Sequence, residues 1–529
     1  MVASNSRALA ALFLGSVVFA SSRALPQGSD VAEAHAVIGS KIVIGDGRIL
    51  EKGRLVVRDG VIEAVDDRLE APADARVLDG TGLTIYPGFF DASLVAGVSA
   101  PTLASEGAPF DATAAASARM RESHRRGIRP EVSAANLLEV TEEVAAQRRQ
   151  AGIALALFQP PAATIGGRSA LAELSGAPRR KVILASDVAL AAELQPAPGE
   201  GYPVSMMGAI SQFRQTLLDA DWQRRVRQAA RTAPAAKLPP FDPLLAALEP
   251  ALDKTLPVAF EAYSDQEIRR ALALSEELGL RPWIVGGTEA WKCASLLASK
   301  SVPVLLSLDF GAEPKEPARR DAASRPSRGE SRPESSPDSA PESAPAATAP
   351  ASRPAWPNPD ELSARVRADR KRRYDERVAN AAALARAGVR FVITTRGLRS
   401  AGELHGALAK AVEKGLPRDA ALAALTAAPA ELFGVSSRAG VLAPGRPAYA
   451  CVVKGAVGDK DLKARAIFVG SQRFDFDLEE ESRPTGDAPP GGRPGGRRRP
   501  REAEDQRSGA PRDERGECGC DDETHGGAR

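Results

Sequence analysis

The stretch that decides the fold is residues 79–92, DGTGLTIYPGFFDA. It ends a region, starting at Ala36, in which short apolar strands alternate with turn residues such as Asp59-Gly60. Gly and Asp at such positions favour the tight turns of β-hairpins. Short strands of the same character return from Gly440 onward. We therefore expect the two distant segments to form one β-rich domain that flanks whatever lies between them.

Between these segments, continuous apolar runs alternate with amphipathic helical stretches, which indicates a parallel sheet with helices on its outer face. The apolar runs are Ile153 to Phe158, Lys181 to Ala185, Leu256 to Phe260, Trp283 to Val285, Val302 to Leu308 and Val389 to Thr394. The helical stretches are Val132 to Ala151, Asp265 to Leu278, Glu289 to Ser299 and Leu362 to Ala387. The predicted class is α/β: a TIM-like (β/α)8 barrel with its site at the C-terminal strand ends, plus a composite β-sandwich.

Two stretches have too little apolar surface to offset the conformational entropy of folding, so both are predicted to be disordered. One holds eleven prolines and the other has no Val, Ile, Leu, Phe or Met. The predicted organisation is a signal segment at 1–24, a composite β-sandwich at 35–86 and 438–478, a barrel at 87–310 and 360–437, a disordered insertion at 311–359 and a disordered tail at 482–529.

The N-terminus has the pattern of a secretory signal. Arg7 precedes the apolar run 8–20, and Val18 and Ala20 form a small-residue cleavage pattern. A run of this length is shorter than the ~20 residues that span a bilayer. We expect a mature protein without a transmembrane segment, exported to the periplasm or the extracellular space. An uncleaved N-terminal anchor stays open as the alternative.

The balance of charge bears on the choice of partner. The chain has 70 Lys and Arg against 68 Asp and Glu, so its net charge is +2. A near-neutral chain does not favour a whole-chain electrostatic partner, so no nucleic-acid partner is predicted. The expected partner is an unknown small molecule or an envelope protein, and a homo-oligomer is possible.

Several ordered motifs resemble the amidohydrolase superfamily, especially exported imidazolonepropionase-like proteins. The resemblance covers roughly residues 36–310 and 360–475. It is carried by YPGFFD at Tyr86 to Asp91, YPVSMMGAISQFRQTLLD at Tyr202 to Asp219, the stretch Pro257 to Leu297, AALAALTAAPAELFG at Ala420 to Gly434 and GVLAPGRPAYACVV at Gly440 to Val453.

The resemblance implies a hydrolase that binds one or two divalent metals such as Zn, which lower the pKa of bound water. The family's ligands are an HxH pair, a carboxylated Lys or a Glu, two further His and a final Asp. In this chain the HxH positions are Ser93 and Val95, and the later His positions are Glu261 and Gly286. The final Asp position is Arg396. No metal site and no cofactor are therefore predicted.

The histidine count supports the same expectation without an alignment, because the chain has only four. His35 precedes the sandwich, and His525 lies in the tail. His124, within RESHRR, fits an exposed surface residue better than a catalytic one. His405 fits a helix-surface or half-buried position better than a catalytic one.

The former ligand positions suggest a replacement for the metal. If Glu261 and Arg396 face one cavity, they can form an ion pair, because either charge buried alone is costly. Tyr263, Glu289 and Asp309 are candidates to line the same opening. The alternative, that each points into solvent from a loop, stays equally open.

Other chemical signatures are scarce. The chain contains no GxSxG, GxxxxGK[ST] or HExxH motif, which leaves serine-hydrolase, P-loop and zincin chemistry without support. Cys518, Cys520 and His525 have ligand types that suit zinc or copper. Whether they bind metal stays open.

Three functions remain. The favoured one is a catalytically silent amidohydrolase homologue that acts in binding or assembly, since a fold does not guarantee an activity. The alternative is an active hydrolase of C–N bonds in cyclic amides or peptide-like substrates, with Glu261 or Asp309 as general base and Arg396 at an oxyanion. The third makes the barrel a scaffold for functional disordered segments.

Overall fold

The computed structural model describes residues 34–98, 126–161, 163–196, 202–232, 238, 240–314 and 364–477. All of them belong to one unit of the chain, Met1–Leu478. The predictions for the signal segment, for His124, for residues 315–359 of the insertion and for the tail with Cys518, Cys520 and His525 lie outside these described residues.

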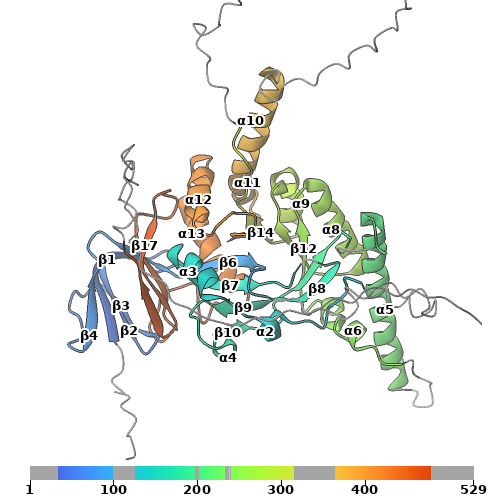
Figure 1. The fold of residues 1–529 in the computed structure, drawn as a ribbon, viewed down its shortest axis with the longest axis horizontal. Helices are drawn as coiled ribbons and strands as arrows, with labels where there is room; N and C mark the ends of the chain where they lie inside the picture. Colours follow the sequence, from blue (N-terminus) through green and yellow to red (C-terminus); the bar gives the residue numbers. More distant parts are fainter. Residues whose placement is uncertain are drawn as a thin grey trace, which may run out of the picture. The chain divides into compact units, whose positions relative to one another are not determined.

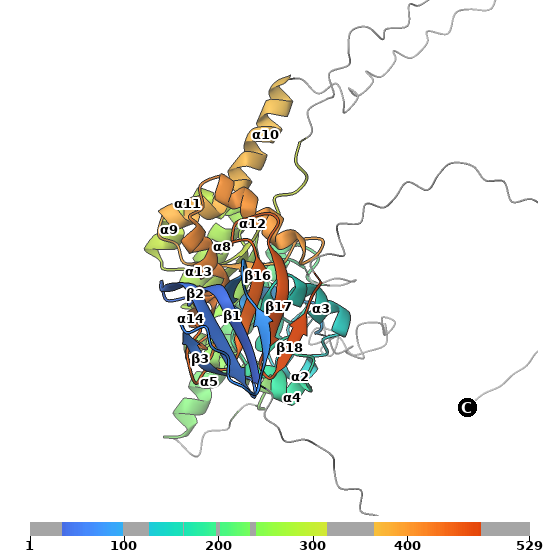
Figure 2. The same ribbon diagram turned by 90° about the vertical axis from the view of Figure 1, so that its left-hand side faces the viewer.

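Strands from both ends of the described chain form one composite sheet. The N-terminal strands are β1 (Ala34–Val43), β2 (Ile49–Arg58), β3 (Val61–Asp66), β4 (Ala75–Asp79) and β5 (Thr84–Pro87). The C-terminal strands are β16 (Tyr449–Lys454), β17 (Lys463–Val469) and β18 (Gln472–Asp475). The order is β18-β17-β16-β5-β1-β2-β3, with β4 paired to β1, so the antiparallel pair β5–β16 joins the two segments. Figure 2 shows the blue and orange strands side by side.

Buried residues of both segments share a small core in this sheet. Ile42, Leu55 and Ile85 come from the N-terminal strands, and Val452 and Phe468 come from the C-terminal strands; each is at most 1% exposed. Their alternation along each strand is the period-2 pattern that the sequence shows. His35 lies within β1, rather than ahead of the first strand as expected, and its ring meets Phe468 edge-on.

The YPGFFD stretch carries the chain from the composite sheet into the next one. Pro87 ends β5, and β6 (Phe89–Leu94) starts two residues later. The glycine between them is required by close packing, because a Cβ at Gly88 would lie 2.6 Å from Cβ of Ala154. Any larger residue at this position would push the two strands apart.

The remaining strands form two mixed sheets. In the first, β6 pairs in parallel with β7 (Ile153–Phe158), followed by β9 (Ala170–Glu173) and β10 (Ile183–Ala185) in antiparallel pairing. The second has the order β15-β14-β13-β12-β11-β8. Its strands are β8 (Ile165–Arg168), β11 (Leu190–Glu193), β12 (Val258–Ala262), β13 (Pro282–Gly286), β14 (Val304–Ser307) and β15 (Phe391–Thr394). From β11 to β15 all neighbours are parallel.

The α/β class is confirmed, but the described strands do not form eight parallel strands in a closed ladder. β8 and β9 are separated by Ser169 alone, and this stretch runs antiparallel to both β7 and β11. Only residues 159–164 connect β7 to β8. Two parallel neighbouring strands need a crossover of about a dozen residues or more between them. Because this connection is shorter, the chain reverses its direction after β7. β6 and β15 are in contact through side chains rather than through a ladder.

Helices pack against these sheets and share a larger core with them. They are α2 (Ala134–Leu137), α3 (Glu142–Gln150), α4 (Arg179–Val182), α5 (Met206–Ala230), α6 (Pro243–Ala246), α7 (Glu249–Leu252), α8 (Asp265–Leu278), η1 (Ala290–Cys293), α9 (Ala294–Ser299), α10 (Ala364–Val378), α11 (Asn380–Arg386), α12 (Glu403–Glu413), α13 (Arg418–Leu425) and α14 (Ala427–Leu432). Figures 1 and 2 show α10 projecting away from the strands. Among the described helices, none combines the length and apolar character needed to cross a bilayer.

Four predicted elements differ from the structure. The helix expected over 362–387 is divided into α10 and α11, and the helix expected over 289–299 begins as the 3-10 helix η1. The helix expected over 132–151 is interrupted, because Leu138 forms an isolated β-bridge with Val98 and Thr141 starts a new helix as its N-cap. The strand expected over 181–185 begins only at Ile183, after the short helix α4. By contrast, α8 has the predicted bounds, since a Ser264–Glu267 capping box starts it and the left-handed residue Gly279 ends it.

Candidate functional site

The C-terminal ends of four strands converge on one guanidinium. Arg396 follows β15, and its Nη1 donates to Ser93 Oγ and Gln159 Oε1, each at 3.4 Å. Its Nε donates to Tyr263 Oη at 3.3 Å, and its Nη2 is ion-paired with Glu261. Ser93 lies on β6, Gln159 follows β7, and Glu261 and Tyr263 lie on and just after β12. We call these five residues the mouth cluster.

The charges of the mouth cluster are largely removed from water. The side chains of Arg396 and Glu261 are 15% and 16% exposed. Tyr263 Oη also donates to Glu261 Oε1 at 2.7 Å, and burial together with this bond raises the pKa of Tyr263 to about 12. Burial by itself lowers the pKa of Arg396, but attraction by Glu261 and Tyr263 outweighs it, so the pKa is raised. Arg396 is therefore held as a guanidinium, with a neutral phenol beside it.

A buried carboxylate beneath the cluster ties β6 to β15. Asp91 has no exposed surface. It accepts hydrogen bonds from Thr395 N at 3.0 Å, Thr394 Oγ1 at 2.8 Å and Ser93 N at 3.3 Å, and from Thr395 Oγ1. The guanidinium of Arg148 lies 3.6 Å away. Asp91 thus supplies the connection that the missing ladder between these strands would otherwise provide.

The structure brings together four of the seven residues predicted for the site: Ser93, Glu261, Tyr263 and Arg396. Within the described residues, the side chains of the other three form no hydrogen bond or ion pair with the mouth cluster, although Glu289 lines a pocket together with Tyr263. Val95 is half-buried in the turn after β6, and Glu289 pairs with Lys292 at 2.9 Å in a neighbouring pocket. Asp309 is exposed, and its carboxylate accepts from Gly311 N at 2.9 Å.

Two polar residues of this region were missed by sequence reasoning. Gln159 directly follows the predicted apolar run 153–158, so its position at a strand end was a usable signal. Glu193 ends β11 in register with Glu261 and lines a pocket of about 230 Å³ beside it. Burial, and then the nearby charge of Glu261, raise the pKa of Glu193.

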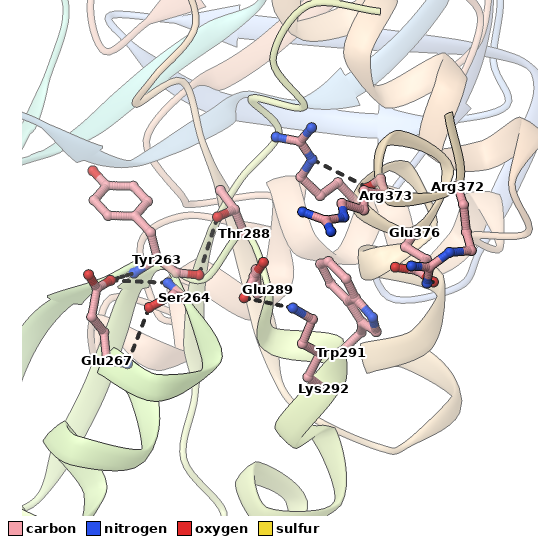
Figure 3. A pocket seen from close by; sticks show the side chains of 11 residues that line it. Tyr263, Ser264, Glu267, Thr288, Glu289, Trp291, Lys292, Arg372, Arg373 and Glu376 are labelled. Carbon is pink, nitrogen blue, oxygen red and sulfur yellow. Dashed lines mark hydrogen bonds and ion pairs between the residues drawn. The ribbon is translucent and has the colours of Figure 1, made fainter. Parts of the chain in front are cut away.

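A larger pocket of about 670 Å³ opens next to the mouth cluster, and Tyr263, a member of the cluster, is one of the residues that line it. Its walls are the turns after β12 and β13, the short helix η1 and the helix α10. Figure 3 shows Tyr263, Thr288 and Glu289 on one side of the pocket and Arg372, Arg373 and Glu376 on the other. The pocket lies at the C-terminal strand ends, where parallel α/β folds place their sites.

The residues at the implied metal positions do not fit a divalent cation. The one carboxylate among them, Glu261, is already paired with the guanidinium of Arg396, which would repel a metal ion. The ring of Tyr263 fills the space at Gly286, where a Cβ would lie 2.7 Å from the ring carbons. Within the described residues, no group of three or more His, Cys, Asp or Glu is placed to hold a metal.

His405 is a core residue, which corrects the expectation of a surface or half-buried position. It lies on α12 and is 5% exposed, with Nε2 3.0 Å from the carbonyl oxygen of Ala151. Its ring meets Phe89 edge-on at 6.1 Å, near the start of β6 and away from the mouth cluster. The face of α12 that carries His405 also carries Leu404 and Leu408, which explains the burial.

Burial lowers the pKa of His405 below its usual value of 6.5, despite the hydrogen bond with Ala151. The unfolded chain therefore binds more protons than the folded chain just below that value, so folding stability is lost as the pH falls through this window. We expect His405→Gln to reduce this loss. Thermal unfolding of both proteins at about pH 7.5 and about pH 5.5 measures it. An equal drop in Tm between the two pH values for both proteins would contradict the lowered pKa of His405.

Fold and site together define an α/β protein with a composite β-sheet and a polar cluster at its strand ends. Residues 358–478 match the amidohydrolase family, a match that covers less than half of the chain. The match includes the motifs at Ala420 to Gly434 and Gly440 to Val453, which carry part of the predicted resemblance. The search among curated proteins found no match.

One solved structure shares the fold, and a second is reported beside it as a weaker likeness. An amidohydrolase from Thermotoga maritima MSB8 is 18% identical, with a TM-score of 0.60 over 83% of this chain and 100% of that chain. A Xaa-Pro dipeptidase with bound methionine in its active site is 12% identical, with a TM-score of 0.45 over 84% of this chain and 100% of that chain.

Proposed function

We propose that this chain is a metal-free amidohydrolase homologue that binds a small molecule at its strand ends and does not catalyse metal-dependent hydrolysis. The observation that carries the proposal is the guanidinium of Arg396 at the centre of the mouth cluster, bonded to Ser93, Gln159, Glu261 and Tyr263. A buried positive charge at this place disfavours a metal ion. The signal-like residues 1–24 are the support for placing this binding function in the cell envelope.

The alternative, hydrolysis of C–N bonds at a non-standard site, has less support. A general base must reach the proton that it removes, and a pKa near the working pH favours the transfer. Glu261 is held by an ion pair and by the phenol of Tyr263, and Asp309 is exposed and bonded to backbone. Arg396, the intended oxyanion donor, already has acceptors for its bonds.

The test is turnover of cyclic amides and dipeptides by wild-type protein and by Glu261→Gln, each treated with EDTA and then reconstituted with Zn²⁺ or Mn²⁺. We expect rates equal to the uncatalysed reaction in every case. Circular dichroism first establishes that the variant is folded. Turnover that EDTA removes and Zn²⁺ restores would overturn the proposal. Metal-independent turnover that is lost in Glu261→Gln would establish the alternative.

A further inference from the structure

We propose that the 670 Å³ pocket binds a small organic anion that carries a planar ring, such as an aryl phosphate, sulfonate or carboxylate. This inference rests on the proposed function, because it names the ligand class for the same strand-end region. The volume lies within the range of about 300–1,000 Å³ that is typical of small-molecule sites. The charge and the shape of the pocket walls indicate the two parts of the ligand.

The acidic side chains of the pocket are already engaged. Glu267 accepts from the two backbone N–H groups that precede α8, at 2.8 and 3.0 Å, as the acid of the capping box. Glu289 pairs with Lys292 at 2.9 Å, and Glu376 pairs with Arg372 at 2.6 Å. A cationic ligand would therefore have to displace an existing partner from each of these carboxylates.

The basic side chains, in contrast, leave a surplus. Arg373 shares the single carboxylate of Asp369 with Arg372, at 2.8 and 2.6 Å. Arg377 donates its Nε to the backbone carbonyl of Arg373 at 3.4 Å, and the described part of the chain offers its guanidinium no carboxylate. Its Nη1 lies 3.3 Å from the position that a Cβ at Gly311 would occupy, so the guanidinium lies beside the backbone there. A half-buried guanidinium with free donors favours a carboxylate, sulfonate or phosphate.

Trp291 supplies the planar surface. Its indole lines the pocket, and the ammonium of Lys292 lies 5.3 Å from the ring centre. The backbone N of Trp291 donates to Oδ1 of the buried Asn380, whose Nδ2 donates to Gly287 O at 2.8 Å. These two hydrogen bonds of Asn380 thus fix the position of η1. Figure 3 shows Trp291 between the strand-end residues and α10, where the flat face of a ring can stack on it.

The test uses phenyl phosphate as probe, with inorganic phosphate and benzylammonium for comparison, in calorimetric titrations at low ionic strength. We expect wild-type protein to bind phenyl phosphate at least about tenfold more tightly than either comparison compound. Arg377→Gln should weaken the binding of phenyl phosphate by about tenfold or more. Trp291→Leu should weaken the binding of phenyl phosphate and leave the binding of inorganic phosphate unchanged.

The matched control is Arg365→Gln, an exposed arginine on the same helix but outside the pocket, which should change affinity by less than about twofold. Equal weakening by both arginine variants would overturn the proposal, because the general charge of α10 would then be the cause. Binding of benzylammonium as tight as that of phenyl phosphate would also overturn it. Neither outcome affects the proposed metal-free state, which the metal content of the protein tests separately.

Discussion

Arg396→Ala is expected to lower the free energy of unfolding by about 3 kcal/mol, because removing one partner of a buried ion pair leaves the other charge unpaired. In the variant, Glu261 keeps only the phenol of Tyr263, and Gln159 and Ser93 lose a donor. Chemical denaturation at neutral pH measures the change. A loss below about 0.5 kcal/mol would show that the pair is effectively solvated.

Three further variants separate this ion pair from other effects of losing an arginine. Arg214→Ala removes a partner of Glu277 in an exposed pair, with side chains 39% and 47% exposed, and should cost about 1 kcal/mol or less. The double variant Arg396→Met with Glu261→Gln should be more stable than Arg396→Met alone, because no buried charge is then left without a partner. A double variant less stable than the single one would contradict the ion-pair explanation.

Asp91→Ala is expected to cost about 3 to 5 kcal/mol, since it removes the only carboxylate that joins β6 to β15 in the described chain. The backbone N–H of Thr395 and its hydroxyl would be left buried without this acceptor, and Arg148 would lose its nearest negative charge. Urea denaturation gives the free energy. Should Asp91→Ala fail to fold, Asp91→Asn gives the readout, because it keeps the shape and one acceptor oxygen and should lose less.

The control for this prediction is Asp79→Ala. Asp79 is exposed and accepts a hydrogen bond from Thr81 N at 2.9 Å in a turn, so its removal should cost about 1 kcal/mol or less. If Asp91→Ala costs no more than this control, Asp91 does not connect the two strands in the way described.

The elements predicted best were those with strong local signals. The alternating strands before Tyr86 and after Gly440 have period-2 patterns, and their pairing follows from the shared core of β5 and β16. The apolar run 153–158 is long enough and apolar enough to be read as a buried strand. Such signals depend only on neighbouring residues, so a single sequence shows them.

The features that were missed depend on distant residues. Residues 165–173 run antiparallel to their neighbours because the connection from β7 is short. The sequence alone does not show this direction, because it does not show that β7 and β11 flank the stretch. The strand β11 (LAAE) is rich in alanine, a weak strand former, so Glu193 was not placed at a strand end. His405 packs against the start of β6, about 300 residues earlier in the chain, and the apolar face of its own helix indicates burial but not this partner.

We propose that the guanidinium of Arg396 occupies the place of a metal ion at the strand ends, and the metal content of the protein tests this proposal most directly. Protein purified without chelators or metal-affinity resin is analysed for Zn, Mn, Fe, Co and Ni, both as the full chain and as a chain ending at Glu481. We predict less than about a tenth of an equivalent in the chain ending at Glu481. Near one equivalent of metal in both proteins would contradict the account. Metal present only in the full chain would lie in the tail with Cys518, Cys520 and His525.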